Sequence, residues 1–212
     1  MQLTKYTHAT VVLTKDDVTI VIDPGTFTPE AEQLASTAAA VLVTHEHGDH
    51  LDVDAVQRAL QAAPDLVVYA PEGVADQLGA ADRVHTVHAG DAFGVGPFSV
   101  QVFGERHAVI HRDLPTIANV GYLVDGSVFH PGDAYLEPGV PVETLLIPTS
   151  GPWSSTAMGV DYIRAVAPKR AIQIHEAMLS ELGQKSTARM LGPEGLGGVQ
   201  TDILEPGTTV TL

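Results

Sequence analysis

Four side chains that can bind metal ions lie in the segment VTHEHGDHLD, residues 43–52. They are His45, His47, Asp49 and His50, and a run of alanine, valine and leucine precedes them. Imidazole and carboxylate groups together suit Zn, Fe or Mn, whereas Mg and Ca prefer sets of oxygen ligands. His45 and His47 can converge on one ion from an extended loop, and the Asp–His pair after the glycine can turn toward a second ion. The segment therefore predicts a transition-metal site.

Several other catalytic motifs are missing from the sequence. The helical zinc-protease motif HExxH does not occur, because the fourth residue after His45 is Asp49 and the fourth after His175 is Leu179. The GxSxG motif of serine hydrolases does not occur either. The chain has no cysteine, which excludes thiolate ligands, disulfides and a cysteine nucleophile. A solvated histidine-rich turn is the alternative interpretation that involves no metal.

Strands and helices predicted on either side of the motif place it on a connecting turn. Apolar or alternating residues predict strands, and amphipathic spacing with capping residues predicts helices. The predicted strands are 2–6, 10–14, 18–22, 41–44, 66–70, 98–103, 119–124, 127–130, 144–148, 171–174, 199–204 and 208–211, and the predicted helices are 29–36, 52–63 and 155–167. The motif follows the carboxyl end of strand 41–44, where α/β proteins commonly build their sites. The order of elements predicts layered sheets covered by helices.

The composition limits the classes of partner. The chain has 212 residues, enough for one sizeable core, and no linker divides it, so we expect a single domain over residues 1–212. Its net charge of −15 disfavours nucleic acid and anionic lipid as partners. No apolar run approaches the roughly 20 residues that span a bilayer, and no signal peptide is evident. We therefore expect a cytoplasmic protein that acts on a small molecule, and a homo-oligomer stays open.

Residues downstream of the first motif complete a resemblance. The pattern HxHxDH after an apolar strand resembles the signature of the metallo-β-lactamase superfamily, whose further ligands are a His, an Asp after a Gly, and a His after a strand. Counterparts here are His107 in FGERHAVIH, Asp133 in HPGDA and His175 in AIQIHE. The resemblance covers nearly the whole chain and implies an α+β fold, the four-layer αββα sandwich.

The N-terminal segments resemble one branch of that superfamily. The segments are THATVVL with His8 and VIDPG with Asp23. They are similar to the branch that contains ascorbate-6-phosphate lactonase-like proteins and N-acyl-phosphatidylethanolamine phospholipase D. Thr7 stands where that branch usually has glycine, which is a small departure.

The resemblance also implies a ligand set. One ion is held by His45, His47 and His107, the other by Asp49, His50 and His175, and Asp133 bridges the two. We expect two divalent transition metal ions, Zn²⁺ first, with Mn²⁺ or Fe as alternatives. Such a pair shares a hydroxide that is available as a nucleophile at neutral pH. The carboxylate of Asp49 is also a candidate to steer this hydroxide or carry a proton.

Four further residues are expected to support the site. Asp23 is expected to accept a hydrogen bond from a ligand histidine, with a plain turn residue as the alternative. His130 is expected to support the turn that carries Asp133. His8 is a candidate catalytic residue that holds substrate or a developing charge, and its alternative is a structural strand histidine. Trp153 is expected to line the substrate pocket, although the adjacent serines can simply cap a helix.

These expectations define a function and its rivals. We expect a binuclear metal-dependent hydrolase whose metal-bound hydroxide attacks a small lactone or ester, with or without a phosphate group. A metal-dependent phosphodiesterase is the alternative within the same chemistry. A di-iron redox protein or a non-enzymatic metal-binding protein is the alternative of another class. Redox relatives usually have Glu at the second ligand position, where this chain has His47.

Overall fold

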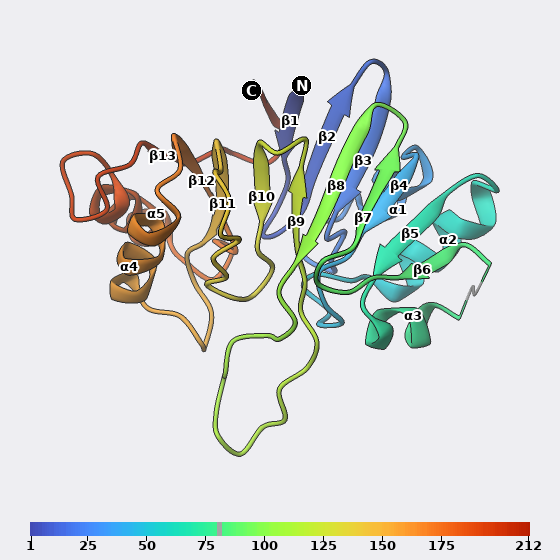
Figure 1. The fold of residues 1–212 in the computed structure, drawn as a ribbon, viewed down its shortest axis with the longest axis horizontal. Helices are drawn as coiled ribbons and strands as arrows, with labels where there is room; N and C mark the ends of the chain where they lie inside the picture. The colour runs from blue at the N-terminus through green and yellow to red at the C-terminus, as the bar shows by residue number, and fades with distance from the viewer. Residues whose placement is uncertain (80–81) are drawn as a thin grey trace.

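The computed structural model describes residues 1–79 and 82–212, and within them the strands form two seven-stranded sheets (Figure 1). The first sheet contains the N-terminal strands. Its order is β14 (Thr208–Thr211), β1 (Gln2–Lys5), β2 (Val11–Lys15), β3 (Val18–Ile22), β4 (Ala40–Leu42), β5 (Val67–Ala70) and β6 (Val84–Thr86). Neighbouring strands pair antiparallel from β14 to β3 and parallel from β3 to β6.

The second sheet repeats this scheme. Its order is β7 (Ala92–Val95), β8 (Phe98–Phe103), β9 (Gly121–Val124), β10 (Val128–His130), β11 (Thr144–Pro148), β12 (Arg170–Ile174) and β13 (Thr201–Asp202). Pairing is antiparallel from β7 to β10 and parallel from β10 to β13. Parallel strands need crossover connections, which is why helices follow the parallel part of each sheet.

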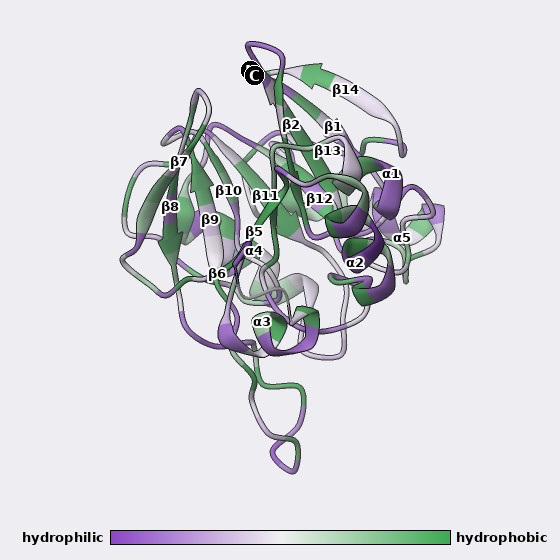
Figure 2. Cartoon of the chain, turned by 90° about the vertical axis from the view of Figure 1, so that its right-hand side faces the viewer, coloured by the Kyte–Doolittle hydropathy of each residue, from purple (hydrophilic) through white to green (hydrophobic). Residues whose placement is uncertain are grey.

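Helices cover the outer face of each sheet. The first sheet is covered by α1 (Ala31–Ser36), α2 (Val53–Ala62) and α3 (Glu72–Leu78), and the second by α4 (Thr156–Val166) and α5 (Glu181–Leu191). In Figure 2, α2 and α3 carry both hydrophilic and hydrophobic residues, as expected of helices that cover a sheet with one face. The predicted αββα sandwich is therefore confirmed. Among the described residues, no helix is long and apolar enough to cross a membrane.

The main core lies between the two sheets. Inward-facing side chains of both sheets meet there, among them Leu13 and Ile20 from the first and Val100, Tyr122 and Ile172 from the second. The Tyr122 hydroxyl crosses between the sheets and donates to the Val43 carbonyl oxygen at 2.9 Å. Alternation along the strands produces this inner face, as the sequence pattern predicted.

The structure contains elements that the sequence did not predict. Strands β6 and β7 and helices α3 and α5 were not predicted. Helix α5 buries only Thr187 and Leu191, so its sequence has no wide apolar stripe. Helix α3 begins after Pro71 and contains Gly73, which weakens its helix propensity. The predicted helices 52–63 and 155–167 are present, each within one residue of the predicted bounds.

The topology aligns the ends of six strands. In the first sheet β1, β3 and β4 run in one direction, and in the second sheet β8, β10 and β12 do so. The predicted ligands follow the carboxyl ends of β4, β8, β10 and β12, and His8 and Asp23 follow those of β1 and β3. Trp153 follows β11, which is parallel to β10 and β12. The loop after β8, residues 104–120, extends from this edge of the molecule (Figure 1).

Candidate metal centre

The loop between β4 and α2 carries four of the predicted ligands, and the loop after β3 braces it. The Thr26 N–H donates to the Gly48 carbonyl oxygen at 2.8 Å, and the Asp52 N–H donates to the Pro24 oxygen at 2.9 Å. A Cβ atom on Gly25 would lie 1.9 Å from the Asp49 carbonyl oxygen, so only glycine allows this close approach. Asp52 then caps α2 by accepting a hydrogen bond from the Ala55 N–H at 2.9 Å.

The first group of potential ligands gathers residues from three loops. His45, His47, His107 and Asp133 place one ligand atom each within 4.8 Å of one another. His45 Nε2 lies 3.2 Å from His47 Nδ1, and His107 Nε2 lies 3.4 Å from Asp133 Oδ2. Three imidazoles and a carboxylate are a donor set that suits a transition metal ion.

The second group lies beside the first. It contains His8, Asp49, His50 and His175, whose ligand atoms also lie within 4.8 Å of one another. His8 was predicted from the sequence to be a catalytic candidate that holds substrate, and it was not among the predicted ligands. Its Nδ1 accepts a hydrogen bond from the Ala177 N–H at 3.4 Å, so its Nε2 carries the proton and donates to Asp49 Oδ2 at 3.1 Å. In this tautomer His8 acts as a donor toward the group.

Asp133 contacts both groups. Its Oδ1 lies 3.0 Å from His50 Nε2, and its Oδ2 lies 3.0 Å from His175 Nε2 and 3.4 Å from His107 Nε2. The residue follows β10 on a buried turn, and its own N–H donates to Asn119 Oδ1 at 2.9 Å. One carboxylate therefore reaches histidines of both groups.

The buried polar atoms of these residues provide a test of whether metal ions fit. Four of them point into the cluster without any hydrogen-bond partner: His50 Nε2, His107 Nε2, His175 Nε2 and Asp133 Oδ1. Leaving such atoms unpaired costs about 1–3 kcal/mol each, so native proteins rarely do it. Divalent ions coordinated by these atoms would satisfy all four. The donor chemistry therefore fits two metal ions.

Hydrogen bonds behind the histidines orient their rings. His50 Nδ1 donates to Asp23 Oδ2 at 2.6 Å, and His45 Nδ1 donates to Thr44 Oγ1 at 3.0 Å. The Thr44 hydroxyl in turn donates to Asp23 Oδ2 at 2.7 Å. His107 Nδ1 donates to the Ala108 carbonyl oxygen at 2.6 Å. Each bond holds the Nδ1 proton behind the ring and turns Nε2 toward the cluster, a common arrangement behind metal ligands.

His130 and Trp153 support the turn that carries Asp133. His130 Nε2 donates to the Ala9 carbonyl oxygen at 2.9 Å, and its Nδ1 accepts from the Gly132 N–H at 3.2 Å. Trp153 Nε1 donates to Asp133 Oδ2 at 3.0 Å, and the side chain is buried. The indole thus contacts the carboxylate between the two groups directly.

Electrostatics keep three of the histidines neutral and Asp133 ionised. Burial lowers the pKa of His45 well below its usual value and also lowers the pKa of His8 and His47, so these rings are neutral near pH 7. Burial works against ionisation of Asp133, but the charge of His50 holds the pKa of that carboxyl well below its usual range. Neutral imidazoles and ionised carboxylates are the states in which these residues coordinate metal.

The remaining histidines lie elsewhere. His111, four residues after His107, is exposed and lies 3.6 Å from Asp113. His85 lies in β6 with its ring 5.1 Å from that of Tyr69, and His88 is exposed nearby in the sequence. His107 therefore belongs to the ligand groups, and the exposed His111 does not.

Several residues that hold the site together were not predicted from the sequence. Thr44 links Asp23 to two ligand histidines, and its signal was a polar residue at the end of an apolar strand directly before His45. Asn119 orients Asp133, and no local pattern marks it. Lys5 and Glu176 were also missed, although alternation with Leu3 predicts that Lys5 faces inward.

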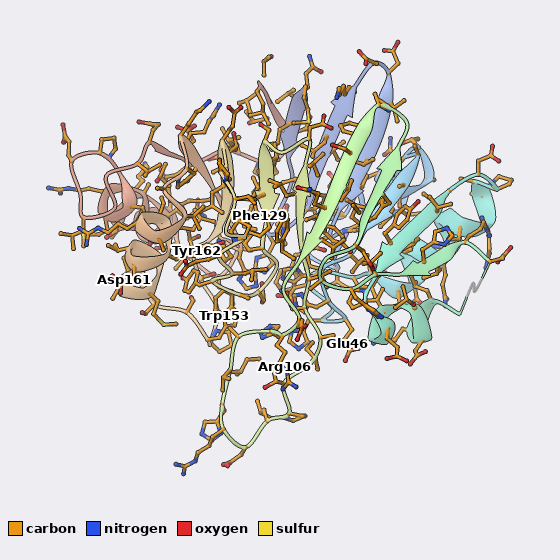
Figure 3. The ribbon with its side chains drawn as sticks, in the orientation of Figure 1. Glu46, Arg106, Phe129, Trp153, Asp161 and Tyr162 are labelled. Carbon is orange, nitrogen blue, oxygen red and sulfur yellow. The ribbon has the colours of Figure 1, made fainter. Side chains whose placement is uncertain are left out.

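A small cavity opens beside the first group. It has a volume of about 20 Å³ and is lined by His47, His107 and apolar residues of the loop after β8, including Ile110 and Leu114. In Figure 3, Trp153, Arg106 and Glu46 lie around the base of this loop. The approach to the cluster thus combines apolar and charged side chains.

Comparisons with known proteins identify the class of this fold and site. The family model described as the beta-lactamase superfamily domain matches residues 2–175. Protein Rv0786c of Mycobacterium tuberculosis is 39% identical over 185 residues, covering 85% of this chain and 86% of that protein. The UPF0173 metal-dependent hydrolase MK1542 of Methanopyrus kandleri is 30% identical over 230 positions, covering 98% of each chain.

A solved structure agrees on the fold. Igni18, described as a novel metallo hydrolase from Ignicoccus hospitalis, superposes with a TM-score of 0.75 at 16% identity, covering 99% of this chain and 97% of that one. The fold is that of the metallo-β-lactamase class. The chain belongs to the beta-lactamase superfamily domain family, which confirms the superfamily predicted from its motifs.

Proposed function

We propose that this chain is a metal-dependent hydrolase that uses two divalent transition metal ions. One ion is held by His45, His47 and His107, the other by Asp49, His50 and His175, and Asp133 lies between them. Zn²⁺ is the first candidate, with Mn²⁺ and Fe as alternatives, because this donor set accepts all three. The names of relatives such as the metal-dependent hydrolase MK1542 support the reaction class.

One observation carries the proposal. The buried atoms of His50, His107, His175 and Asp133 that lack hydrogen bonds all belong to the two ligand groups. His50 Nε2 and Asp133 Oδ1 lie 3.0 Å apart, yet neither atom forms a hydrogen bond. Metal ions coordinated by the four atoms would satisfy them.

The protein residues orient the reactants around this centre. When bound, such a pair of ions lowers the pKa of a bound water toward about 7 and polarises a carbonyl or phosphoryl oxygen. The Asp49 side chain is partly exposed and accepts a hydrogen bond from His8. Burial opposes its ionisation, but hydrogen bonds from His175 and His8 hold the pKa of this carboxyl well below its usual range, so it stays ionised and is placed to orient a water molecule. His8 carries its proton on Nε2, toward the group, where it can donate to a substrate oxygen.

We further propose a small lactone or ester as substrate, with or without a phosphate group. Apolar residues of the loop after β8, including Ile110 and Leu114, lie beside His47 and His107, where they can contact the apolar part of a small ring or acyl group. Arg106 lies next to His107, and among the described residues it forms no salt bridge, so it is available to an anionic substituent. These features agree with the lactonase-like branch suggested by the N-terminal segments, and a phosphodiester is the second choice. The cytoplasmic location and the single domain stay predictions from sequence.

The experiment is a substrate panel on protein reconstituted with Zn²⁺ or Mn²⁺. Lactones, carboxylic esters, phosphorylated lactones and phosphodiesters are compared for wild type, His47→Ala and His85→Ala. We expect turnover of at least one lactone or ester that His47→Ala abolishes and that the exposed His85→Ala leaves unchanged. Metal-loaded wild type with no turnover of any class would contradict the hydrolase and favour a metal-binding protein without catalysis.

A further inference from the structure

We infer that Lys5 and Glu176 form a buried ion pair that positions His8 and His175, and with them the second ligand group. Both are positioning residues, since neither belongs to the ligand groups themselves. The inference rests on the proposed function for its consequence in metal binding. The geometry of the pair stands on its own.

The contacts of the pair connect the two sheets. Lys5, at the end of β1, has a fully buried side chain, and its Nζ donates to Glu176 Oε1 at 3.0 Å and also to the Tyr6 carbonyl oxygen. Glu176 follows β12 in the other sheet. The same Oε1 accepts a hydrogen bond from the His8 backbone N–H at 3.0 Å. One carboxylate oxygen therefore holds both the lysine and the backbone of His8.

The backbones of the two histidines need this support. His8 has φ of 62° and His175 has φ of 58°, a left-handed conformation that costs a non-glycine residue about 1 kcal/mol or more. The His175 N–H donates to the His8 carbonyl oxygen at 3.1 Å, so each strained residue fixes the other. Their ring centroids lie 3.8 Å apart. A shift of either backbone would move both rings.

The rings in turn hold the second group. His8 Nε2 lies 3.1 Å from Asp49 Oδ2, and His175 Nε2 lies 3.4 Å from the same oxygen and 3.0 Å from Asp133 Oδ2. The contacts of Lys5 and Glu176 reach this group through His8 and His175. The first group, by contrast, is oriented by Thr44 and the Ala108 carbonyl oxygen. Loss of the pair should therefore affect the second group selectively.

Stability alone is a weak reason for such a pair. Taking two charges out of water is costly, and well-packed apolar residues often stabilise a core as well or better. What apolar residues cannot supply is an acceptor for the His8 N–H. Lys15 and Asp125 provide a natural comparison, because they also join the two sheets, at 2.7 Å, but lie at the ends of strands away from the ligand groups and remain partly exposed.

The test measures metal affinity and backbone protection in Lys5→Met. Zn²⁺ is titrated against a competing chelator, and His47→Ala and Asp49→Ala assign the two binding steps to their groups. We expect the affinity of the second ligand group for its ion to fall about 10–100-fold, which is the usual effect of losing a hydrogen-bond partner behind a ligand. The affinity of the first ligand group should not change. In metal-free protein, we expect faster hydrogen exchange of the His8 amide.

Matched variants separate positioning from stability. Lys15→Met should leave both binding steps and His8 exchange unchanged. Glu176→Gln keeps the amide oxygen as acceptor and should preserve most His8 protection, whereas Glu176→Met should lose it. The comparison of Glu176→Gln with Glu176→Met shows whether residue 176 holds the His8 backbone, even if Lys5→Met fails to fold.

Two results would overturn the inference. One is an equal fall of both affinities in Lys5→Met, and the other is an identical exchange rate of the His8 amide in Glu176→Gln and Glu176→Met. Failure of the proposed function would look different, because wild type would then bind no metal while the exchange comparison still reports on the pair.

Discussion

Asp133 contacts histidines of both ligand groups, so the geometry of both groups depends on its position. Its two oxygens lie 3.0 Å from His50 Nε2 and from His175 Nε2, respectively, and a third contact reaches His107 at 3.4 Å. The turn that carries it is fixed by Asn119 on the backbone side and by the Trp153 N–H on the carboxylate side. The orientation of this single side chain therefore sets the geometry of both groups.

Trp153→Phe tests that orientation. The variant keeps an aromatic ring but removes the N–H that donates to Asp133 Oδ2. We expect metal affinity or turnover to fall about 10-fold and the free energy of unfolding to fall by about 1–3 kcal/mol, as for other hydrogen bonds to charged groups.

Tyr162→Phe is the control, because it removes a buried hydrogen bond, from its hydroxyl to the Leu136 oxygen at 2.7 Å, away from the ligand groups. It should lose stability and keep metal affinity. Equal metal affinity in Trp153→Phe and wild type would contradict the role of the indole.

Metal binding should depend on pH through His50 and His175. Burial opposes protonation, but the carboxylates of Asp133 and Asp23 raise the pKa of His50 well above its usual value, and those of Asp133 and Asp49 raise the pKa of His175. In metal-free protein these protons stabilise the fold at low pH, and that contribution is lost as pH rises through the raised pKa values. Protons and metal compete for the same rings, so metal affinity should rise with pH and binding should release protons.

Calorimetry in buffers of different ionisation enthalpy measures that release, alongside apparent affinity between about pH 6 and about pH 8. Affinity that does not change over this range, with no proton release, would contradict the protonated state inferred for the two histidines.

At the scale of elements, the ligand loop is held by the loop that precedes α1. Gly25 sits so close to the Asp49 carbonyl oxygen that a Cβ would be 1.9 Å away. Since Gly25 itself is buried against the ligand loop, no side chain at residue 25 fits without moving that loop. The position of the ligands thus depends on a residue that contacts no ligand side chain.

Gly25→Ala and Gly48→Ala form a matched pair. In Gly25→Ala the added methyl should displace the ligand loop, cost about 1–3 kcal/mol of stability as overpacking does, and lower metal affinity at least 10-fold. In Gly48→Ala the nearest atom would lie 3.9 Å away on Thr26, so little should change. Metal titration and thermal unfolding of both variants provide the comparison, and equal effects would contradict this account of the loop.

Local sequence patterns predicted the elements that present the ligands, because each ligand follows a strand with clear apolar residues. The helix after the first motif was also predicted from Asp52 and its apolar spacing. Helix α5 was not predicted, because its sequence is mostly polar and only Thr187 and Leu191 are buried. Lys5 and Glu176 lie 171 positions apart in the sequence, and they meet only because the two sheets pack together.

At the scale of the whole molecule, the two sheets repeat one pairing scheme and place their functional strand ends at one edge. No internal repeat was found in the sequence, because the scheme is conserved in strand order and not in residues. The four layers themselves followed from the resemblance to the superfamily, since periodicity alone predicted only layered sheets. The net charge of −15 is also a property of the whole molecule, because repulsion between like charges acts on the entire folded state.

Salt should therefore stabilise the metal-free protein. Like charges repel in the folded state, and raising ionic strength from about 0.01 M to about 0.15 M shortens the screening length from about 30 Å to about 8 Å. We expect a higher Tm at the higher ionic strength, equally with NaCl and KCl, as measured by thermal unfolding. A Tm that falls or stays constant would show that the acidic charges are already balanced within the fold.

The metal content of protein purified without chelator tests directly whether the two ligand groups bind two metal ions. Wild type is compared with Asp133→Ala, His107→Ala and the exposed control His111→Ala, each reconstituted with Zn²⁺ or Mn²⁺. The account predicts about two equivalents of transition metal in wild type and in the control, with a clear loss in the other two variants. Folded wild type that stays metal-free after reconstitution, or equal metal loss in His111→Ala and His107→Ala, would contradict it.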